Sequence, residues 1–521
     1  MIGILLSILF IKFVLRKQVR QGISNVLYSI SKRSGKLNRH NMYSSVVTSA
    51  LTVGFGGSVG LEGPTISTGA AFGSFASRIM GLDFKLRSLM MACACAGTMA
   101  AIFKAPIAAI VFAVEVFMID LTTFSLMPLL FASVFAVLTS WFFLGNDVLY
   151  PFTVVETFAL GDLPFYILLG IVCGLVSVYF TKVYEWLEER FIQIGGVFWK
   201  LMVGGLILGG LIFLFPSFYG EGYESINACL QGDLSYLFSN SLFVGLEDKL
   251  WVAIGLLSLI VLLKIVATSL TLGAGGIGGV FAPTLFMGVN TGMLFATLVN
   301  FSGIRELNSN NFALIGMAGL IAGVMHAPLT AIFLIADISG GYALFVPLMV
   351  TAAFAFLTAK SMIKDSIYHA QLARRKELFT HHRDQATLRM LKVKNLIERD
   401  FLPLSPKASL RDLTQAISIS QRNIFPVVDA EDNFLGIIKM DDVRHLIFKP
   451  DLYDKVMISE LICIPQYRIS PSDSMETVAE KFQMSDKFNM PVIEDGKYCG
   501  FISRANVFST YREKVKQFSH D

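Results

Sequence analysis

The sequence predicts an all-α polytopic membrane domain, an inverted repeat with broken and re-entrant helices, followed by an α/β tandem of two small soluble units. Three observations carry this prediction. Hydrophobic residues make up 54% of the 521-residue chain and charged residues 16%, against about 25% charged residues in a typical globular protein. Long apolar runs recur up to about residue 362 and then stop. One glycine-rich pattern also occurs twice, about 219 positions apart.

The chain starts with an apolar segment at 1–14 that is interrupted by Lys12. A helix that crosses a bilayer needs about 20 apolar residues, so this segment is short. Basic residues follow it, at Arg16 and Lys17, whereas in a signal peptide they precede the apolar part. We therefore expect a membrane helix whose beginning lies upstream of this chain.

Further apolar runs follow, and several are too short to cross a bilayer perpendicular to its plane. Short runs beside Gly and Pro indicate broken or re-entrant helices, which are tolerated only where protein or a water-filled cavity covers the exposed backbone. The runs lie at 89–102, 107–117, 126–144, 163–180, 198–215, 250–272, 285–299, 312–324, 329–338 and 342–357.

Four landmarks occur in the same order in both halves of the apolar region. The segment GGSVGLEGPTISTG at 56–69 matches GGIGGVFAPTLFMG at 275–288, each a glycine cluster followed by Pro-Thr. The segment 97–107 likewise resembles 319–329. An acid follows the proline by nine positions in each copy, at Glu115 and Asp337. Such duplication of Gly/Pro-interrupted segments indicates two homologous halves of opposite orientation, with a transport site where they meet.

The duplicated segments have the residue types that an anion site needs. Pro64 and Pro283 suit the first turn of a helix, and the preceding glycines let the backbone turn and come close to a ligand. The amides of a helix start carry the positive end of the helix dipole and bind an anion without lysine or arginine. Two opposed helix starts would cradle a desolvated halide, yet weakly enough to release it.

The first copy also carries an acid, Glu62. A carboxylate beside two positive helix ends mimics the anion, so Glu62 would occupy the anion position when ionised and move away when protonated. That would make it a gate coupled to protons or to anion occupancy. The alternative is a carboxylate that only caps a helix. The duplicated context, and the rarity of ionisable residues in membrane spans, favour the gate.

The chain becomes hydrophilic after Tyr368. The basic cluster at 374–376 marks the exit into water and predicts that this end is cytoplasmic. From about Val393 two similar units follow, each predicting strand, hairpin turn, strand and helix. The paired segments are FPVVD at 425–429 with GIIKMDDV at 436–443, and MPVIE at 490–494 with GFISRANV at 500–507.

Together these motifs resemble the CLC family of chloride channels and proton-coupled chloride transporters. GLEGP at 60–64 is similar to the family's gating-glutamate motif, and GGVFAP at 278–283 is similar to its second anion-binding motif. IYHA at 367–370 resembles the helix segment whose tyrosine hydroxyl contacts the central anion. The resemblance covers nearly the whole chain, including two C-terminal CBS-type units. It implies that Glu62 is the gate and that the anion site consists of Gly60, Gly63, Gly279, Val280, Phe281 and Tyr368.

The resemblance also implies an organisation for the whole chain. We expect a transmembrane anion-transport domain at 1–375, a linker at 376–392, a first CBS domain at 393–450 and a second at 451–521. The expected protein is a homodimer with one anion pathway per subunit, embedded in the lipid bilayer of the plasma or inner membrane, with cytoplasmic CBS domains. Chloride is the expected substrate and no cofactor is required. Basic residues are not interleaved with aromatic ones, so no nucleic-acid partner is expected.

Two departures from the family pattern bear on selectivity and mechanism. The family's first anion loop reads Gly-Ser-Gly-Ile-Pro, and here Gln21 replaces the serine associated with chloride preference, beside Gly22. Both are expected as additional anion contacts. Exchangers of the family carry a second glutamate that takes protons from the cytoplasm, and the alignment puts Val116 there, next to Glu115. Valine does not relay protons, so Glu115 is either a structural acid or a substitute proton relay.

CBS pairs often bind adenine nucleotides, with an acid on the ribose at the end of a Gly-hydrophobic-hydrophobic-Ser/Thr-x-x-Asp segment. The first unit has Lys439 in place of Ser/Thr but keeps Asp442, and the second has Ser503 and Asn506. Neither matches fully. Nucleotide binding through Asp442, Ser503 and Asn506 and a purely structural, dimerising role therefore both stay open.

We therefore expect passive, gated transport of chloride or a similar small anion, with chloride/proton antiport as the alternative. A membrane enzyme would need a nucleophile with a base or a His-Glu-x-x-His zinc site. The sequence contains no such zinc motif, so neither catalytic residues nor a metal site are expected. A CBS-regulated cation transporter would need carboxylate-rich spans, whereas these spans hold few acids beyond Glu62, Glu115 and Asp337.

Overall fold

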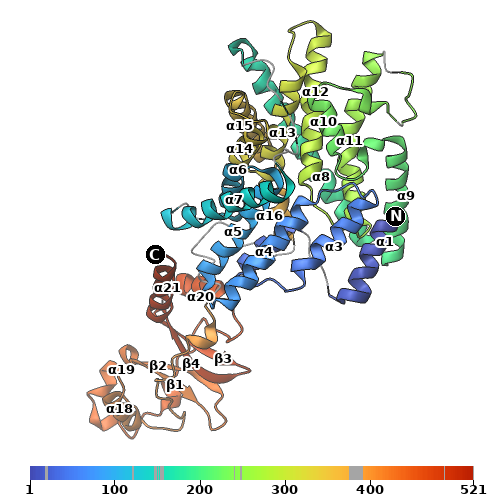
Figure 1. Ribbon diagram of the computed structural model, residues 1–521. Helices are drawn as coiled ribbons and strands as arrows, with labels where there is room; N and C mark the ends of the chain where they lie inside the picture. Colours follow the sequence, from blue (N-terminus) through green and yellow to red (C-terminus); the bar gives the residue numbers. More distant parts are fainter. Residues whose placement is uncertain are drawn as a thin grey trace. The chain divides into compact units, whose positions relative to one another are not determined.

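The computed structural model describes residues 1–17, 22–119, 122–145, 150, 152, 158–239, 241–246, 249–374, 391–485 and 487–519. They divide into two compact units, Met1–Leu378 and Phe379–Asp521. The first unit is helical, and the named strands belong to the second (Figure 1). The predicted fold class, a helical membrane domain followed by an α/β tandem of CBS type, is confirmed.

The first unit contains both long helices and short ones that end inside the protein. Its α-helices are α1 (Ile2–Leu9), α2 (Gly22–Lys32), α3 (Asn41–Gly54), α4 (Glu62–Ile79), α5 (Phe84–Phe103), α6 (Pro106–Phe117), α7 (Thr123–Leu144), α8 (Leu163–Gln193), α9 (Val197–Leu214), α10 (Tyr223–Leu230), α11 (Leu250–Gly273), α12 (Phe281–Ser302), α13 (Ser309–Met325), α14 (Pro328–Ile338), α15 (Phe345–Met362) and α16 (Ile367–Arg374).

The duplicated segments break helices at corresponding places. The first glycine-rich segment separates α3 from α4, and the second separates α11 from α12. A second pair of breaks separates α5 from α6 and α13 from α14. At these breaks Lys104 and His326 both adopt left-handed backbone, with φ of 53° and 54°, and Pro106 and Pro328 each begin the next helix. Proline lacks an amide hydrogen and suits such a first turn, so corresponding prolines begin the helix after the break in both halves.

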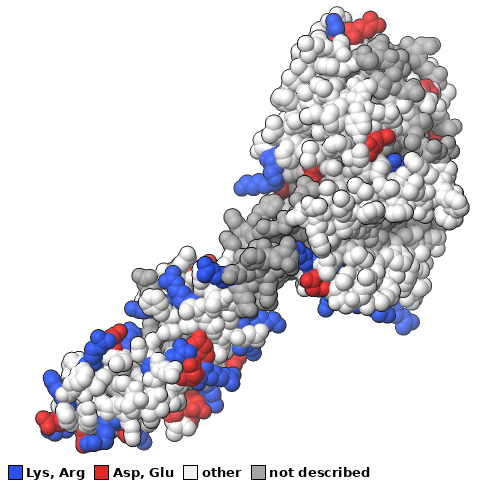
Figure 2. Space-filling view, turned by 60° about the vertical axis from the view of Figure 1, so that its left-hand side comes forward, with Lys and Arg blue, Asp and Glu red and all other residues white. Residues whose placement is uncertain are grey.

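Burial distinguishes the centre of the unit from its periphery. Seven helical stretches among the described residues are long and apolar enough to cross a membrane. Of these, α12 is mostly buried and packs on α13, whereas α7 and α9 expose most of their length. The exposed side chains of α7 include Phe142 and Phe143, which suits a lipid-facing surface. In the view of Figure 2 the first unit shows few charged side chains on its surface. The chain is a multi-pass membrane protein.

The second unit contains two copies of the predicted strand, turn, strand and helix. In each copy two antiparallel strands pair, with Phe425 opposite Ile438 in the first and Met490 opposite Ile502 in the second. A short parallel bridge extends each pair, at Leu404 in one copy. The elements are α18 (Leu410–Ile419), β1 (Ile424–Val428), β2 (Phe434–Lys439), α19 (Met440–Ile447), α20 (Met475–Ser485), β3 (Asn489–Glu494), β4 (Lys497–Ser503) and α21 (Arg504–Ser519).

Candidate anion site and gate

The two glycine-rich loops contact each other through their backbones. The Gly60 amide donates to the Gly279 carbonyl at 2.8 Å, and the Gly279 amide donates back to the Gly60 carbonyl at 2.7 Å. A Cβ on Gly60 would lie 2.2 Å from Glu62 Oε2, and one on Gly279 would lie 3.0 Å from the Gly63 nitrogen. Only glycine allows so close an approach, which brings the start of α4 to the start of α12.

Two threonines fasten the loops on either side of this contact. The Ser58 amide donates to Thr271 Oγ1, and the Ile277 amide donates to Thr52 Oγ1, both at 3.1 Å. Thr52 and Thr271 occupy corresponding positions of the repeat, so each half supplies the hydroxyl that accepts from the other half's loop. This reciprocity fits two halves of opposite orientation.

The facing helix starts leave amide groups available for an anion. Thr65 makes the first intrahelical hydrogen bond of α4, and Thr284 makes that of α12. The amides before them have no acceptor within their own helix, because the first turn of a helix lacks one. These amides and the aligned helix dipoles make both starts electropositive. The amides belong to Glu62, Gly63, Phe281 and Ala282.

Glu62 lies at this junction with its side chain fully enclosed. The residue is 1% exposed, and its Oε1 accepts a hydrogen bond from the Tyr223 hydroxyl at 2.5 Å. Oε2 makes no hydrogen bond of standard geometry with a described residue. The backbone amides of Glu62 itself and of Ala282 still act on the carboxylate. The carboxylate therefore occupies the electropositive space at the start of α12.

The structure brings the remaining expected anion contacts to the same region, with one exception. Gly22 begins α2, and a Cβ there would lie 3.5 Å from the Gly63 carbonyl carbon. Tyr368 is buried, and its hydroxyl donates only to Met325 Sδ at 3.9 Å, a weak acceptor. Tyr368 also lies within electrostatic reach of Glu62. Gln21 lies outside the described residues.

Sequence analysis missed two residues that contact Glu62 or the neighbouring Leu61. Glu221 Oε1 accepts a hydrogen bond from the Leu61 amide at 2.9 Å, and Tyr223 is the hydroxyl donor to Glu62. Tyr150 packs edge-on against Tyr223 at 5.5 Å between ring centroids. The available signal was an acid between two glycines, Gly-Glu-Gly-Tyr at 220–223. This segment lies far along the chain from both duplicated motifs, so the repeat gave no reason to associate Glu221 and Tyr223 with them.

A buried lysine lies behind the first loop. Lys264 has no exposed surface, and its Nζ donates to Ser58 Oγ at 3.0 Å. Its ammonium group lies 4.5 Å from the ring centroid of Phe286, a cation–π contact. Lys264 also attracts Glu221 electrostatically. The negative charge of Glu221 is therefore partly balanced by this buried cation.

Glu115 serves as a helix cap. Its Oε2 accepts from the amide and the hydroxyl of Thr330 at 2.8 and 2.7 Å, and its Oε1 accepts from the Leu329 amide at 3.1 Å. Asp337 does the same in reverse, accepting from the Ala108 amide at the start of α6 at 3.4 Å. The acid ending one half's helix thus caps the first turn of the other half's helix. These contacts give Glu115 the structural role of a helix cap.

The residues expected to bind nucleotide are divided between two environments. Ser503 Oγ donates to Glu398 Oε1 at 2.5 Å and accepts from the Asn506 amide at 3.1 Å. Asn506 Nδ2 reaches the Leu396 carbonyl at 3.4 Å. Asp442 is exposed in the first turn of α19. Two of the three side chains are therefore used within the protein itself. Among the described residues, no group of three His, Cys, Asp or Glu side chains could hold a metal ion.

Comparison with known protein families identifies the chain. A family model described as voltage gated chloride channel matches residues 3–360, and a CBS-domain model matches residues 393–449 and 455–513. The chain belongs to the CLC family of voltage-gated chloride channels. As a CLC protein it carries anions across the membrane, with chloride as the transported ion.

Individual CLC relatives agree with this assignment. The voltage-gated ClC-type chloride channel ClcB of Citrobacter koseri is 30% identical over 332 residues, which span 63% of this chain and 75% of that protein. The structure of a slow cyanobacterial Cl⁻/H⁺ antiporter superposes with a TM-score of 0.59 at 24% identity, over 72% of this chain and 85% of the other. That of a eukaryotic CLC transporter also gives 0.59, at 17% identity, over 97% and 88%. At these identities the two structures establish the fold alone.

Proposed function

We propose that the protein is a gated passive pathway for chloride, with Glu62 as the gate. The observation that carries the proposal is the position of the Glu62 carboxylate, enclosed beside the amides at the starts of α4 and α12. Those amides would bind chloride in the same space once the carboxylate leaves. Gly60, Gly63, Gly279, Val280 and Phe281 form the surrounding backbone, and Gly22 and Tyr368 would contact the ion from α2 and α16.

The proposed gating follows from the charge of the carboxylate. When ionised, Glu62 is attracted by the helix starts and held by the Tyr223 hydroxyl, so it excludes chloride. Protonation removes that attraction, because the helix dipoles favour negative charge only. Chloride then competes successfully for the amides. A high chloride concentration would displace the ionised carboxylate by the same competition.

Chloride/proton antiport is the second candidate, and Glu221 is the observation that favours it. Glu221 is a second carboxylate within electrostatic reach of Glu62, and it could pass protons to Glu62. In α6, Val116 is buried and apolar, and the Glu115 carboxylate is occupied by the start of α14. Because these residues offer no continuation for a proton, passive transport is preferred.

Simultaneous measurement of chloride and proton flux in liposomes tests the proposal. We expect chloride efflux down its gradient with no proton movement against the proton gradient, increasing as pH falls. The Glu62→Gln variant mimics the protonated gate, so it should conduct chloride at a rate independent of pH. Uphill proton movement driven by a chloride gradient would establish antiport instead, and an unchanged pH response in Glu62→Gln would remove Glu62 as the gate.

For the second unit we propose a cytoplasmic, structural CBS pair within a homodimer. The internal use of Ser503 and Asn506 supports a structural role, since nucleotide binding would depend on Asp442. The mass of the purified protein in nanodiscs, with and without ATP, is the test. We expect two copies per particle and no added nucleotide mass. One copy per particle, or one ATP per copy, would contradict the respective part of this proposal.

A further inference from the structure

The first unit contains a polar cavity of about 240 Å³ beside α2 that is separate from the chloride gate. It lies between α2, the loop at 33–40 and the start of α3. Ser24 lies on another face of α2 and donates to Gln371 of α16 at 2.7 Å. The face of α2 that packs toward α16, the helix of Tyr368, is therefore not the face that lines the cavity. The cavity is lined by Lys17, Asn25, Tyr28, Ser29, Arg33, Leu37, Asn38 and Asn41.

Three buried polar atoms of this cavity have no hydrogen-bond partner among the described residues. They are Asn25 Nδ2, Ser29 Oγ and Asn41 Oδ1, on residues that are 7%, 0% and 4% exposed. A buried polar group is costly to leave without a partner, and such a group in a native protein calls for a water or an ion to complete it. Three of them around one cavity indicate a bound polar group.

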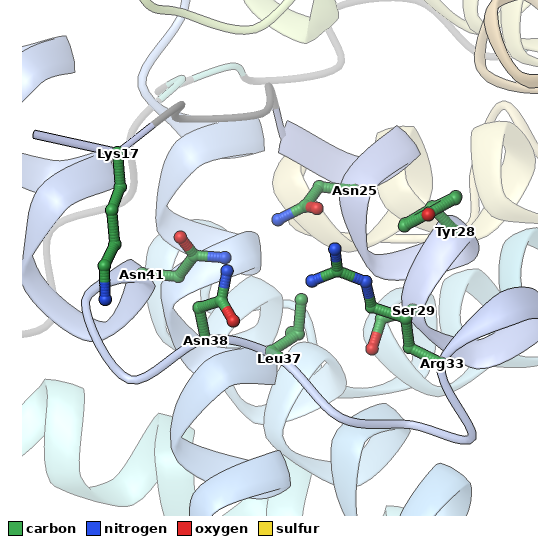
Figure 3. Close-up of a pocket in the computed structure, with 8 residues that line it drawn as sticks. All are labelled: Lys17, Asn25, Tyr28, Ser29, Arg33, Leu37, Asn38 and Asn41. Atoms are coloured by element: carbon green, nitrogen blue, oxygen red, sulfur yellow. The ribbon is translucent and has the colours of Figure 1, made fainter. Parts of the chain in front are cut away.

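The charge of the lining selects an anion. Lys17 and Arg33 are basic, and the lining contains no carboxylate. Figure 3 shows Asn38 and Asn41 facing Asn25 and Arg33 across the same space. Arg33 stacks its guanidinium over the Tyr28 ring at 5.4 Å, which leaves its donors free to turn toward the cavity. Within the part of the chain that the structure describes, neither Lys17 nor Arg33 is in an ion pair.

Neighbouring arginines hold the loop that closes the cavity. Arg78 Nη2 donates to the Leu37 carbonyl at 3.0 Å, and Arg87 Nη1 donates to the Ser34 carbonyl at 2.8 Å. Arg39 and Arg87 repel Arg78 electrostatically. The site is therefore built into a fixed loop, and it lies in a region of accumulated positive charge that a bound anion would relieve.

We propose that this cavity binds a phosphate-class oxyanion. The planar guanidinium of Arg33 matches two oxygens of such an ion. The Asn25 amide, the Ser29 hydroxyl and Lys17 supply further donors, more than a single halide needs. Asn41 Oδ1 is an acceptor, and the hydroxyl of a hydrogen phosphate would donate to it. The phosphate comes either from solution or from the headgroup of a membrane lipid, since both present the same oxygens.

Binding of inorganic phosphate to the full-length protein in phosphatidylcholine nanodiscs tests the site. We expect saturable binding that Arg33→Gln weakens at least tenfold. Asn25→Asp, which is nearly isosteric and introduces a negative charge, should weaken it at least as much. Arg39→Gln is the matched control: it removes the same charge from the same loop, but Arg39 stacks on Phe75 and does not line the cavity. Its affinity should stay within twofold of the wild type.

A second arm identifies the source of the oxyanion. If nanodiscs containing phosphatidic acid show Arg33-dependent lipid binding that inorganic phosphate does not displace, the site takes a lipid headgroup. Glu62→Gln should bind phosphate like the wild type, so failure of the gate proposal and failure of this one are distinguishable. Equal losses of phosphate affinity in Arg33→Gln and Arg39→Gln would show that binding depends on surface charge alone. Absence of Arg33-dependent binding in both arms would mean that only water fills the cavity. Either result overturns the proposal.

Discussion

At the scale of single residues, the buried Glu62 carboxylate is the costliest group in the site. An isolated carboxylate in an apolar interior is strongly disfavoured and persists only with partners. Glu62 has a hydroxyl from Tyr223 and the backbone amides of Glu62 itself and of Ala282 at the two helix starts. Glu221 opposes these, because a second negative charge repels the first. In the proposed gating, a carboxylate balanced in this way would change position in response to one proton or one chloride ion.

Removal of the Tyr223 hydroxyl should therefore favour the open gate. Hydrogen bonds to charged groups contribute about 1.5–3 kcal/mol, and each 1.4 kcal/mol is a tenfold change in an equilibrium. We expect Tyr223→Phe to raise chloride flux at neutral pH by about tenfold and to reduce its dependence on pH. Liposome flux measured across a pH series gives both quantities.

Tyr219→Phe is the matched control for this substitution. It removes a hydroxyl from the same segment, but the Tyr219 hydroxyl donates to the Gly54 carbonyl at 3.2 Å and does not contact Glu62. Its flux should equal that of the wild type. Equal effects of the two substitutions, or a lower flux in Tyr223→Phe, would show that the hydroxyl does not hold the gate closed.

At the scale of helices, the two halves are joined by reciprocal contacts between corresponding elements. The glycine loops exchange backbone hydrogen bonds, Thr52 and Thr271 accept from each other's loops, and α6 and α14 cap each other through Glu115 and Asp337. Each contact uses one residue from each half. The first turns of α6 and α14 therefore find acceptors in the other half that their own helices lack.

The cap at the start of α14 has a measurable effect on stability. Loss of a capping side chain costs about 0.5–2 kcal/mol, so Glu115→Ala should lower the free energy of unfolding by about that amount. Asp337→Ala should cost less, since its contact to Ala108 is longer. Thermal unfolding of the purified protein in detergent measures both.

Transport by the same variants separates the structural role of Glu115 from a proton relay. Glu115→Gln keeps an acceptor oxygen for the cap but does not titrate, so it should leave the chloride flux and its pH dependence unchanged. A pH response that is lost in Glu115→Gln, with the unfolding temperature preserved, would restore Glu115 as a relay.

At the scale of the whole molecule, the transport site and the CBS pair belong to separate compact units. Glu398 connects the two CBS copies, since it accepts from Arg422 Nη2 at 2.8 Å and from the Ser503 hydroxyl. Its backbone also bridges to Phe501 of β4. One side chain thus joins the turn before β1 to the end of β4, which fixes the two copies relative to each other.

Glu398→Ala should therefore loosen the CBS pair without changing chloride selectivity. We expect the free energy of unfolding of the CBS pair to fall by about 1–2 kcal/mol. This is at the lower end for hydrogen bonds to charged groups, because Arg422 is partly exposed. Hydrogen exchange of β1–β2 and β3–β4 should accelerate together. Asp454→Ala breaks the exposed pair with Arg411 and should leave exchange unchanged. Faster exchange in one hairpin alone would show that Glu398 does not couple the copies.

The sequence alone determined the class of the molecule, and it singled out the glycines and the acid that meet where the two halves join. Hydropathy marks membrane spans because backbone in lipid must be helical, and the repeated Gly and Pro mark breaks because few other residues tolerate that backbone. Gly60, Glu62, Gly63 and Gly279 were therefore predictable from local pattern. The family resemblance added Tyr368.

Only the tertiary structure decided which distant side chains complete that site. Tyr223 contacts Glu62, Glu221 contacts Leu61 and Lys264 contacts Ser58 from 161, 160 and 206 positions away along the chain. No local spacing encodes such contacts. The role of Glu115 was open for the same reason: its partners, Leu329 and Thr330, lie in the other half. The sequence pattern specifies where a helix begins, whereas the packing of the two halves specifies which side chains contact the start of that helix.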